Sequence, residues 1–160
     1  MSGIPSLGPR GEGWLVLQAF LLGAVLAACV LNPDTAGLPD PASTAVGLVL
    51  VLVGGVATLS GVFALRAADS LAALPHPGPR ASLVTTGAYA YVRHPIYAGL
   101  IALAFGASIA RDSGSGLVAT LLLAVVLDLK RRVEESRLST RFPSYDDYRA
   151  TTKALVPFLY

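Results

Sequence analysis

The residues best suited to chemistry gather in two short segments, and the first runs from Gly87 to Tyr97 as GAYAYVRHPIY. Pro95 favours a helix start, because the N–H that it lacks is not needed in a first turn, and it holds His94 toward extended backbone. The free N–H groups and the positive dipole end of such a helix attract anions. Arg93, His94 and this helix start could therefore hold a carboxylate.

The second segment, Lys130 to Glu135, places three cations one residue before two adjacent carboxylates. Its plain interpretation is an i,i+4 pair of Arg131 with Glu135 on a solvated face, which contributes only a few tenths of a kcal/mol, roughly. Arg93 and the tyrosines of the first segment could likewise be simple anchors at a membrane interface. Taken separately, neither segment decides between structure and chemistry.

The residues after Glu135 predict how the second segment ends. Leu138, Phe142 and Tyr145 recur at helical spacing, so they would bury one face of a continuing helix. Pro143 interrupts that helix, and the Ser144-to-Asp147 spacing predicts a capping box that starts another short helix.

The composition indicates that the elements carrying these segments lie in a membrane. The chain has 160 residues, of which 54% are hydrophobic and 14% charged, and its mean hydropathy is +0.63. Two uncharged runs, Trp14 to Leu31 with 18 residues and Thr44 to Leu65 with 22, are close to the ~20 helical residues that a hydrocarbon core requires. Pro95 to Ala110 and Leu117 to Leu129 predict two shorter spans that need tilt, a thinner bilayer or a longer last helix. We predict an all-α fold, a polytopic membrane helix bundle of about four transmembrane helices with a cytoplasmic C-terminal helical segment, in one domain over 1–160.

The connecting segments are polar, and their charges predict an orientation. Asn32 to Ser43 is predicted to be a proline-rich loop, Arg66 to His94 a longer loop and Arg111 to Gly116 a tight turn. Only Arg111 would lie on one side of the membrane. The cations on the other side are Arg10, Arg66, Arg80, Arg93, Lys130, Arg131, Arg132, Arg137, Arg141, Arg149 and Lys153. The positive-inside tendency therefore predicts a multi-pass integral protein whose chemical residues and two termini are cytoplasmic.

The chain has a single cysteine, Cys29, which excludes an internal disulfide. Its only histidines are His76 and His94, which cannot build a metal site by themselves, so we expect none. The sequence Leu26-Ala27-Ala28-Cys29 has the small-residue pattern of a lipoprotein cleavage site. We expect Cys29 to lie at the outer end of a retained helix. Lipidation of Cys29, after removal of Met1 to Ala28, is the alternative.

Considered together, the two segments closely resemble the isoprenylcysteine carboxyl methyltransferase and phospholipid methyltransferase superfamily of integral membrane enzymes. The pattern G-x-Y-x-x-x-R-H-P-x-Y is present as Gly87, Tyr89, Arg93, His94, Pro95 and Tyr97. The pattern E-E-x-x-L-x-x-x-F with two later tyrosines is present as Glu134, Glu135, Leu138, Phe142, Tyr145 and Tyr148. The likeness extends from Leu83 to about Pro157. Phe142-Pro143-Ser144-Tyr145 is one residue shorter than the frequent F-G-x-x-Y, so the placement of Tyr145 stays open.

The resemblance implies that the cofactor is S-adenosylmethionine. It carries over eight cofactor-binding residues, namely Gly87, Tyr89, Arg93, His94, Pro95, Tyr97, Glu134 and Glu135. We assign Arg93 and His94 to the carboxylate of the cofactor and either glutamate to its ammonium group. Tyr97, with Tyr89 as a second candidate, would face the sulfonium or the adenine. The residues assigned to catalysis are Arg93, Arg131, Arg132 and Glu135.

The implied reaction is an in-line displacement on the methyl carbon by a lipophilic or lipid-anchored acceptor that enters from the bilayer, with no metal and no nucleic acid involved. A carboxylate acceptor needs no base, and Arg131 or Arg132 could orient it, whereas an amine acceptor needs a nearby carboxylate or tyrosine. The acceptor stays open among a prenylated cysteine carboxylate, a phospholipid amine, a small thiol and a modified peptide. The alternatives are a non-catalytic membrane scaffold and a small four-helix transporter that uses Asp128.

Overall fold

The computed structural model describes residues 5, 7–31, 40–70 and 82–160. Within these ranges the chain is all-helical, with five α-helices, one short 3-10 helix and no strand. The elements are α1 (Glu12–Leu31), α2 (Pro41–Ala67), η1 (Gly87–Ala90), α3 (Pro95–Ala110), α4 (Gly114–Arg141) and α5 (Tyr145–Thr151).

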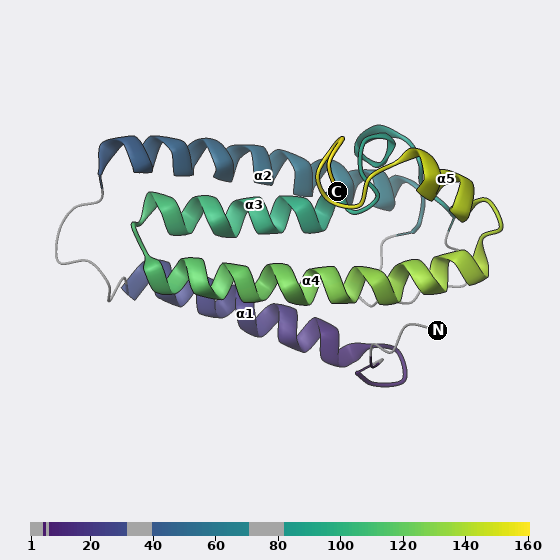
Figure 1. Ribbon diagram of the computed structural model, residues 1–160, viewed down its shortest axis with the longest axis horizontal. Helices are drawn as coiled ribbons and strands as arrows, with labels where there is room; N and C mark the ends of the chain where they lie inside the picture. The colour runs from purple at the N-terminus through teal and green to yellow at the C-terminus, as the bar shows by residue number, and fades with distance from the viewer. Residues whose placement is uncertain (1–4, 6, 32–39, 71–81) are drawn as a thin grey trace.

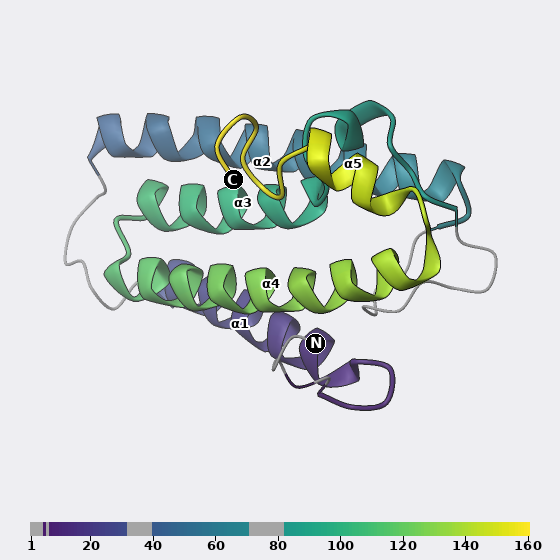
Figure 2. The same cartoon turned by 45° about the vertical axis from the view of Figure 1, so that its right-hand side comes forward.

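The four long helices form an elongated bundle of two pairs (Figure 1). Helix α2 lies antiparallel along α3, and α1 crosses α4 obliquely, while α3 and α4 lie side by side and join the two pairs (Figures 1 and 2). The turn between α3 and α4 lies at one end of the bundle. Helices η1 and α5 lie at the other end, beside the start of α3 and the end of α4.

A stripe of glycines allows α2 and α3 to approach each other closely. The buried residues of α2 are Gly47, Gly54 and Gly61. A Cβ on Gly54 would lie 2.6 Å from the carbonyl oxygen of Gly99 in α3, and a Cβ on Gly47 would lie 2.5 Å from that of Gly106. Small residues at such positions are typical of helices that pack in lipid, where backbone proximity replaces the hydrophobic drive. By sequence, Gly54, Gly55 and Gly61 could have served contacts within or between chains, and Gly54 and Gly61 face α3 of the same chain.

The outward face of α2 is apolar along its whole length. The exposed large residues of this helix are Val46, Leu48, Val49, Leu52, Val53, Val56, Leu59 and Phe63. Helices α1 and α2 are both long and apolar enough to cross a membrane, and α3 is a shorter apolar helix. An apolar surface of this extent is unfavourable in water, which supports membrane association. The first two predicted spans lie within α1 and α2, and membrane crossing by α3 and α4 stays a prediction.

At two predicted boundaries, residues that were interpreted as loop formers begin helices. Helix α2 starts at Pro41, three residues before the predicted span, since Asp40 caps it by accepting a hydrogen bond from the Ser43 N–H at 2.9 Å. Helix α4 starts at Gly114 inside the predicted turn, because Ser113 Oγ accepts a hydrogen bond from the Gly116 N–H at 3.1 Å. Helix α3 has the predicted bounds, and residues 32–39 and 71–81 of the predicted loops lie outside the described residues.

The charged half of α4 continues its apolar half without a break. A longer last helix was one of the three predicted alternatives, and α4 has this form. The helix ends at Arg141, and Phe142 is its C-terminal cap, so Tyr145 belongs to the separate helix α5. The predicted capping box at Ser144 was wrong. Ser144 has a near-helical backbone (φ −80°, ψ −1°), and its side chain makes no capping hydrogen bond.

The α2–α3 contact makes a prediction that two adjacent glycines can test. We expect Gly54→Ala to destabilise the protein by about 1–3 kcal/mol, because its new methyl group would overlap the α3 backbone. Gly55→Ala is the matched control. Its Cβ meets nothing within 4 Å, so the removal of a helical glycine should stabilise the protein by about 0.5–1 kcal/mol. Thermal unfolding in detergent measures both effects, and equal effects at the two positions would contradict the assigned packing.

Candidate functional site

Three segments that are distant in the sequence meet at the α5 end of the bundle. The Arg93 N–H donates to the Lys153 carbonyl at 2.8 Å, and the His94 N–H donates to the Ala154 carbonyl at 3.0 Å. Val92 and Lys153 form a parallel backbone bridge. This pairing fixes the chain after α5 against the residues that lead into α3, whose Arg93 and His94 side chains contact Glu135 in the charged half of α4.

Glu135 of α4 is the centre of this assembly. Its carboxylate lies 3.0 Å from Arg93 Nε, 3.2 Å from His94 Nε2, 3.5 Å from Arg131 Nη1 and 3.8 Å from Arg149 Nε. The residue is only 4% exposed. The predicted i,i+4 pair of Arg131 and Glu135 is therefore present, but it is buried within a network and does not lie on a solvated face.

Arg93 also holds the C-terminal segment in place. Its Nη1 atom donates to the carbonyl of Arg149 at 3.2 Å and to that of Thr152. The Tyr148 hydroxyl donates to the carbonyl of Tyr89 in η1 at 2.6 Å. These bonds close the site on the side of α5.

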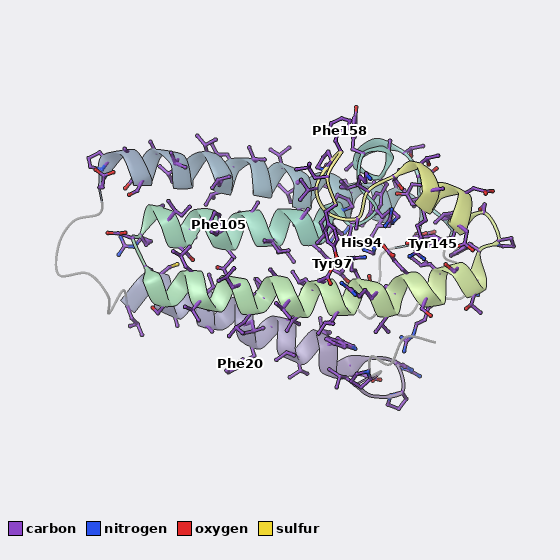
Figure 3. The ribbon with its side chains drawn as sticks, in the orientation of Figure 1. Phe20, His94, Tyr97, Phe105, Tyr145 and Phe158 are labelled. Atoms are coloured by element: carbon purple, nitrogen blue, oxygen red, sulfur yellow. The ribbon has the colours of Figure 1, made fainter. Side chains whose placement is uncertain are left out.

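Glu134 forms the second half of the network, toward the interior of the bundle. The Tyr97 hydroxyl donates to its Oε1 atom, and His94 Nδ1 lies 3.7 Å from its Oε2 atom. The rings of His94 and Tyr97 stack with centroids 5.4 Å apart and planes at 9°. Lys130 Nζ lies over the Tyr97 ring, 5.2 Å from its centroid. Figure 3 places His94 and Tyr97 between the start of α3 and α4, with Tyr145 toward α5.

The pKa values of the two adjacent carboxyl groups are shifted in opposite directions. Burial opposes ionisation of Glu135, but the hydrogen bond and charge of His94, together with Arg93, outweigh it and lower the pKa of Glu135 to about 2. Burial dominates at Glu134 and raises its pKa, although His94, Tyr97 and Lys130 favour the ionised form. Glu135 is thus an anion at neutral pH, while Glu134 is the group better able to take up a proton.

A second polar cluster adjoins the first along α4. Asp128 lies 2.7 Å from Arg131 Nη2 and 2.8 Å from Arg132 Nε, and it accepts a hydrogen bond from the Tyr160 hydroxyl at 2.9 Å. Arg131 lies over the Tyr160 ring, 5.0 Å from its centroid. Arg131 therefore connects Glu135 with the outer cluster.

The structure brings most of the predicted site residues together. Those that meet in the network are Arg93, His94, Tyr97, Arg131, Glu134 and Glu135, and buried Pro95 begins α3 beside them. Arg132 lies at the rim, with 51% of its side chain exposed. Tyr89 is buried and binds Tyr148 through its backbone. Gly87 is exposed and lies in the turn that starts η1, where its φ of +62° favours glycine.

Sequence reasoning missed several participants. Lys130 could have been found from its i,i+4 spacing to Glu134 on one helix face. Arg149, Thr152 and Tyr160 carry no such signal, because they reach the network only through the turn at Pro143 and the backbone pairing after α5. Gln18 of α1, which binds Lys130 at 2.8 Å, has no sequence relation to either segment.

The profile of the phospholipid methyltransferase family matches residues 42–144. That range covers more than half of the chain and includes both charged segments. The chain belongs to the phospholipid methyltransferase family. The family is part of the isoprenylcysteine carboxyl methyltransferase-like superfamily, so the resemblance seen in the sequence is confirmed. Phospholipid methyltransferase membership indicates a membrane methyltransferase, and such enzymes generally use S-adenosylmethionine. Helices α1 and α5 lie outside the matched residues.

A curated relative is the nickel-cobalt-cadmium resistance protein NccN of Alcaligenes xylosoxydans xylosoxydans, with 39% identity over 83 residues. The alignment covers 48% of this chain and 37% of the relative, so the chain spans little more than a third of that protein. In the part of the chain that the structure describes, no group of three or more His, Cys, Asp or Glu residues could hold a metal ion.

The lowered pKa of Glu135 predicts how acid affects this phospholipid methyltransferase family member. A carboxyl group with a depressed pKa in the folded state stabilises the fold above its ordinary pKa of 4.5, and this stabilisation is lost as the pH falls toward about 2. We expect acidification from pH 5 to pH 3 to lower the unfolding temperature of the wild type more than that of Glu135→Gln. Asp69→Asn is a matched control on an exposed residue whose φ of +50° asparagine tolerates. An equal fall of the unfolding temperature in the wild type and in Glu135→Gln would contradict the assigned network.

Proposed function

We propose that the protein transfers a methyl group from S-adenosylmethionine to a lipophilic or lipid-anchored acceptor at the membrane surface where α3 begins. The observation that carries this proposal is the compact network of Glu134 and Glu135 with Arg93 and His94. It lies at one end of a bundle whose outer faces are apolar. By the positive-inside tendency, this end would face the cytoplasm, where the cofactor is made.

The charges of the network fit the cofactor. S-adenosylmethionine carries a carboxylate and an ammonium group close together, and its recognition needs both signs in a small space. Arg93 and His94, which we assign to the carboxylate, are bound to Glu135 at 3.0 and 3.2 Å. The amino-acid part of the cofactor adds one charge of each sign, so it can join a set that contains both signs without leaving its carboxylate or its ammonium group unpaired.

One buried polar atom also fits a ligand. Tyr145 is 1% exposed, and its hydroxyl has no hydrogen-bond partner among the described residues. Burial raises its pKa, and the negative charge of Glu135 raises it further. A buried hydroxyl without a partner costs about 1–3 kcal/mol, and a bound molecule with a donor or acceptor at this point would relieve that cost.

The residues of the chain supply binding, orientation and proton handling. When bound, the cofactor supplies an electrophilic methyl group. Glu135 stays ionised and holds the surrounding cations in position. Glu134 is the candidate base for an amine or thiol acceptor, since it is the weaker acid of the two. A carboxylate acceptor would need no base, and Arg131 or Arg132 beside Asp128 would orient it.

The apolar outer faces of α1 and α2 favour an acceptor that moves within the bilayer. A prenylated cysteine carboxylate and a phospholipid amine both move within the bilayer. Arg131 or Arg132 would orient the carboxylate, and Glu134 would serve as the base for the amine. Asp128 is engaged by Arg131, Arg132 and Tyr160, which gives the transporter alternative no support.

Release of S-adenosylhomocysteine tests the proposal directly. The purified protein in lipid nanodiscs, supplied with S-adenosylmethionine and either farnesylcysteine or phosphatidylethanolamine, is expected to release S-adenosylhomocysteine with at least one acceptor. Glu135→Gln should lower this rate by about 100-fold, on the order of 3 kcal/mol, because it removes the anion that organises the site. Asp69→Asn should keep the wild-type rate. An unchanged rate in folded Glu135→Gln, or no release with any acceptor class, would contradict the proposal.

Tyr145→Phe separates ligand binding from stability. Because its hydroxyl has no partner, we expect this substitution to leave the unfolding temperature unchanged or to raise it slightly. Binding of S-adenosylmethionine, measured as the thermal stabilisation it confers, should weaken about threefold to tenfold. Tyr148→Phe is the comparison, because its hydroxyl bonds the Tyr89 carbonyl and its loss should lower stability. A fall in stability without weaker binding in Tyr145→Phe would overturn this assignment.

A further inference from the structure

Helix α1 sends one polar side chain toward the network. Gln18 is the single amide or charged residue between Trp14 and Leu31. Its Oε1 atom accepts a hydrogen bond from Lys130 Nζ at 2.8 Å. Polar groups within apolar spans are costly and commonly functional. Because α1 lies outside the residues that the family profile matches, this contact is a feature of this chain that the family assignment does not explain.

Lys130 connects Gln18 with the site. It is 2% exposed, which is unusual for a lysine. Its ammonium group lies 5.2 Å from the centroid of the Tyr97 ring, and the Tyr97 hydroxyl bonds Glu134. Gln18, Lys130, Tyr97 and Glu134 thus form one continuous path from α1 to the paired carboxylates.

We propose that Lys130, positioned by Gln18, sets how strongly the site binds a positively charged sulfur relative to a neutral one. This inference rests on the proposed function. The Tyr97 ring face is the kind of surface that attracts a cation, and the Lys130 ammonium lies over it. The resemblance implies that the sulfonium lies near Tyr97, and a fixed positive charge there would weaken binding of the sulfonium cofactor while leaving the neutral thioether product almost unaffected.

This arrangement would favour the forward reaction. The sulfonium loses its charge as the methyl group leaves, so repulsion from Lys130 is present before transfer and absent after it. An interaction that is more favourable in the transition state than in the ground state increases the rate. Lys130 is thus a candidate electrostatic residue of the site, and Gln18 is a positioning residue that acts through it.

The preference for S-adenosylmethionine tests the role of Lys130 without measuring turnover. We express it as the ratio of the dissociation constant of S-adenosylhomocysteine to that of S-adenosylmethionine. Calorimetry on the 160-residue protein in detergent gives the dissociation constants of S-adenosylmethionine and S-adenosylhomocysteine. In Lys130→Met we expect the preference for S-adenosylmethionine to rise about threefold to tenfold. Lys130→Arg keeps the positive charge, so its ratio should stay within about twofold of the wild-type ratio. Arg66→Met removes an exposed cation at the end of α2 and should not change the ratio.

A double-mutant cycle tests whether Gln18 acts through Lys130. Gln18→Met should raise the ratio by less than Lys130→Met does, and it should add nothing in the Lys130→Met background. If Lys130→Met does not fold, Gln18→Glu offers a second route, because a carboxylate at position 18 would offset the ammonium charge and raise the ratio.

The outcomes separate this inference from the proposed function. If the wild type binds both compounds and the ratio is the same in Lys130→Met or Gln18→Glu, the inference is wrong and the proposed function stands. Additive effects of Gln18→Met and Lys130→Met would remove Gln18 from the positioning role. If the wild type binds neither compound, the proposed function fails, and the inference fails with it.

Discussion

A buried carboxylate must be paired, and Glu135 meets that requirement with basic groups from three parts of the chain. Arg93 and His94 precede α3, Arg131 lies one turn earlier on α4, and Arg149 lies in α5. An unpaired charge at this depth would cost several kcal/mol, roughly, so the three segments cannot move apart independently. The path of the chain at this end of the bundle follows from the need to surround one anion.

The rest of the bundle obeys a different constraint. Along α2 and α3 no charge is buried. The two helices approach each other through glycines, because in lipid apolar side chains gain no hydrophobic free energy by packing against another helix. This close backbone contact sets the position of α3 against α2, and with it the position of Pro95 and His94 at the start of α3. The bundle is therefore largely apolar over most of its length, and its buried charged groups are concentrated at one end.

The sequence predicted the parts of this structure that depend on local signals. Helix α3 has the predicted bounds, because Pro95 begins it and Arg111 follows its last apolar residue. Pro41 misled the prediction of α2, since a proline after a capping aspartate starts a helix as readily as it breaks one. The resemblance predicted that Arg93, His94 and Glu135 share a site. Gln18 and Arg149 could not be predicted, because their contacts depend on how α1 and α5 align with α4, and periodicity contains no such information.

The backbone pairing of Arg93 and His94 with Lys153 and Ala154 also has a consequence for biosynthesis. Helices α1 to α4 all precede Lys153 and Ala154 in the chain, so the ribosome makes them first. The charged end cannot close until Lys153 and Ala154 have been made, because their carbonyls hold the residues that lead into α3. The site is thus among the last regions of this chain that can assemble, and a chain truncated before Lys153 would lack the carbonyls that hold the residues leading into α3.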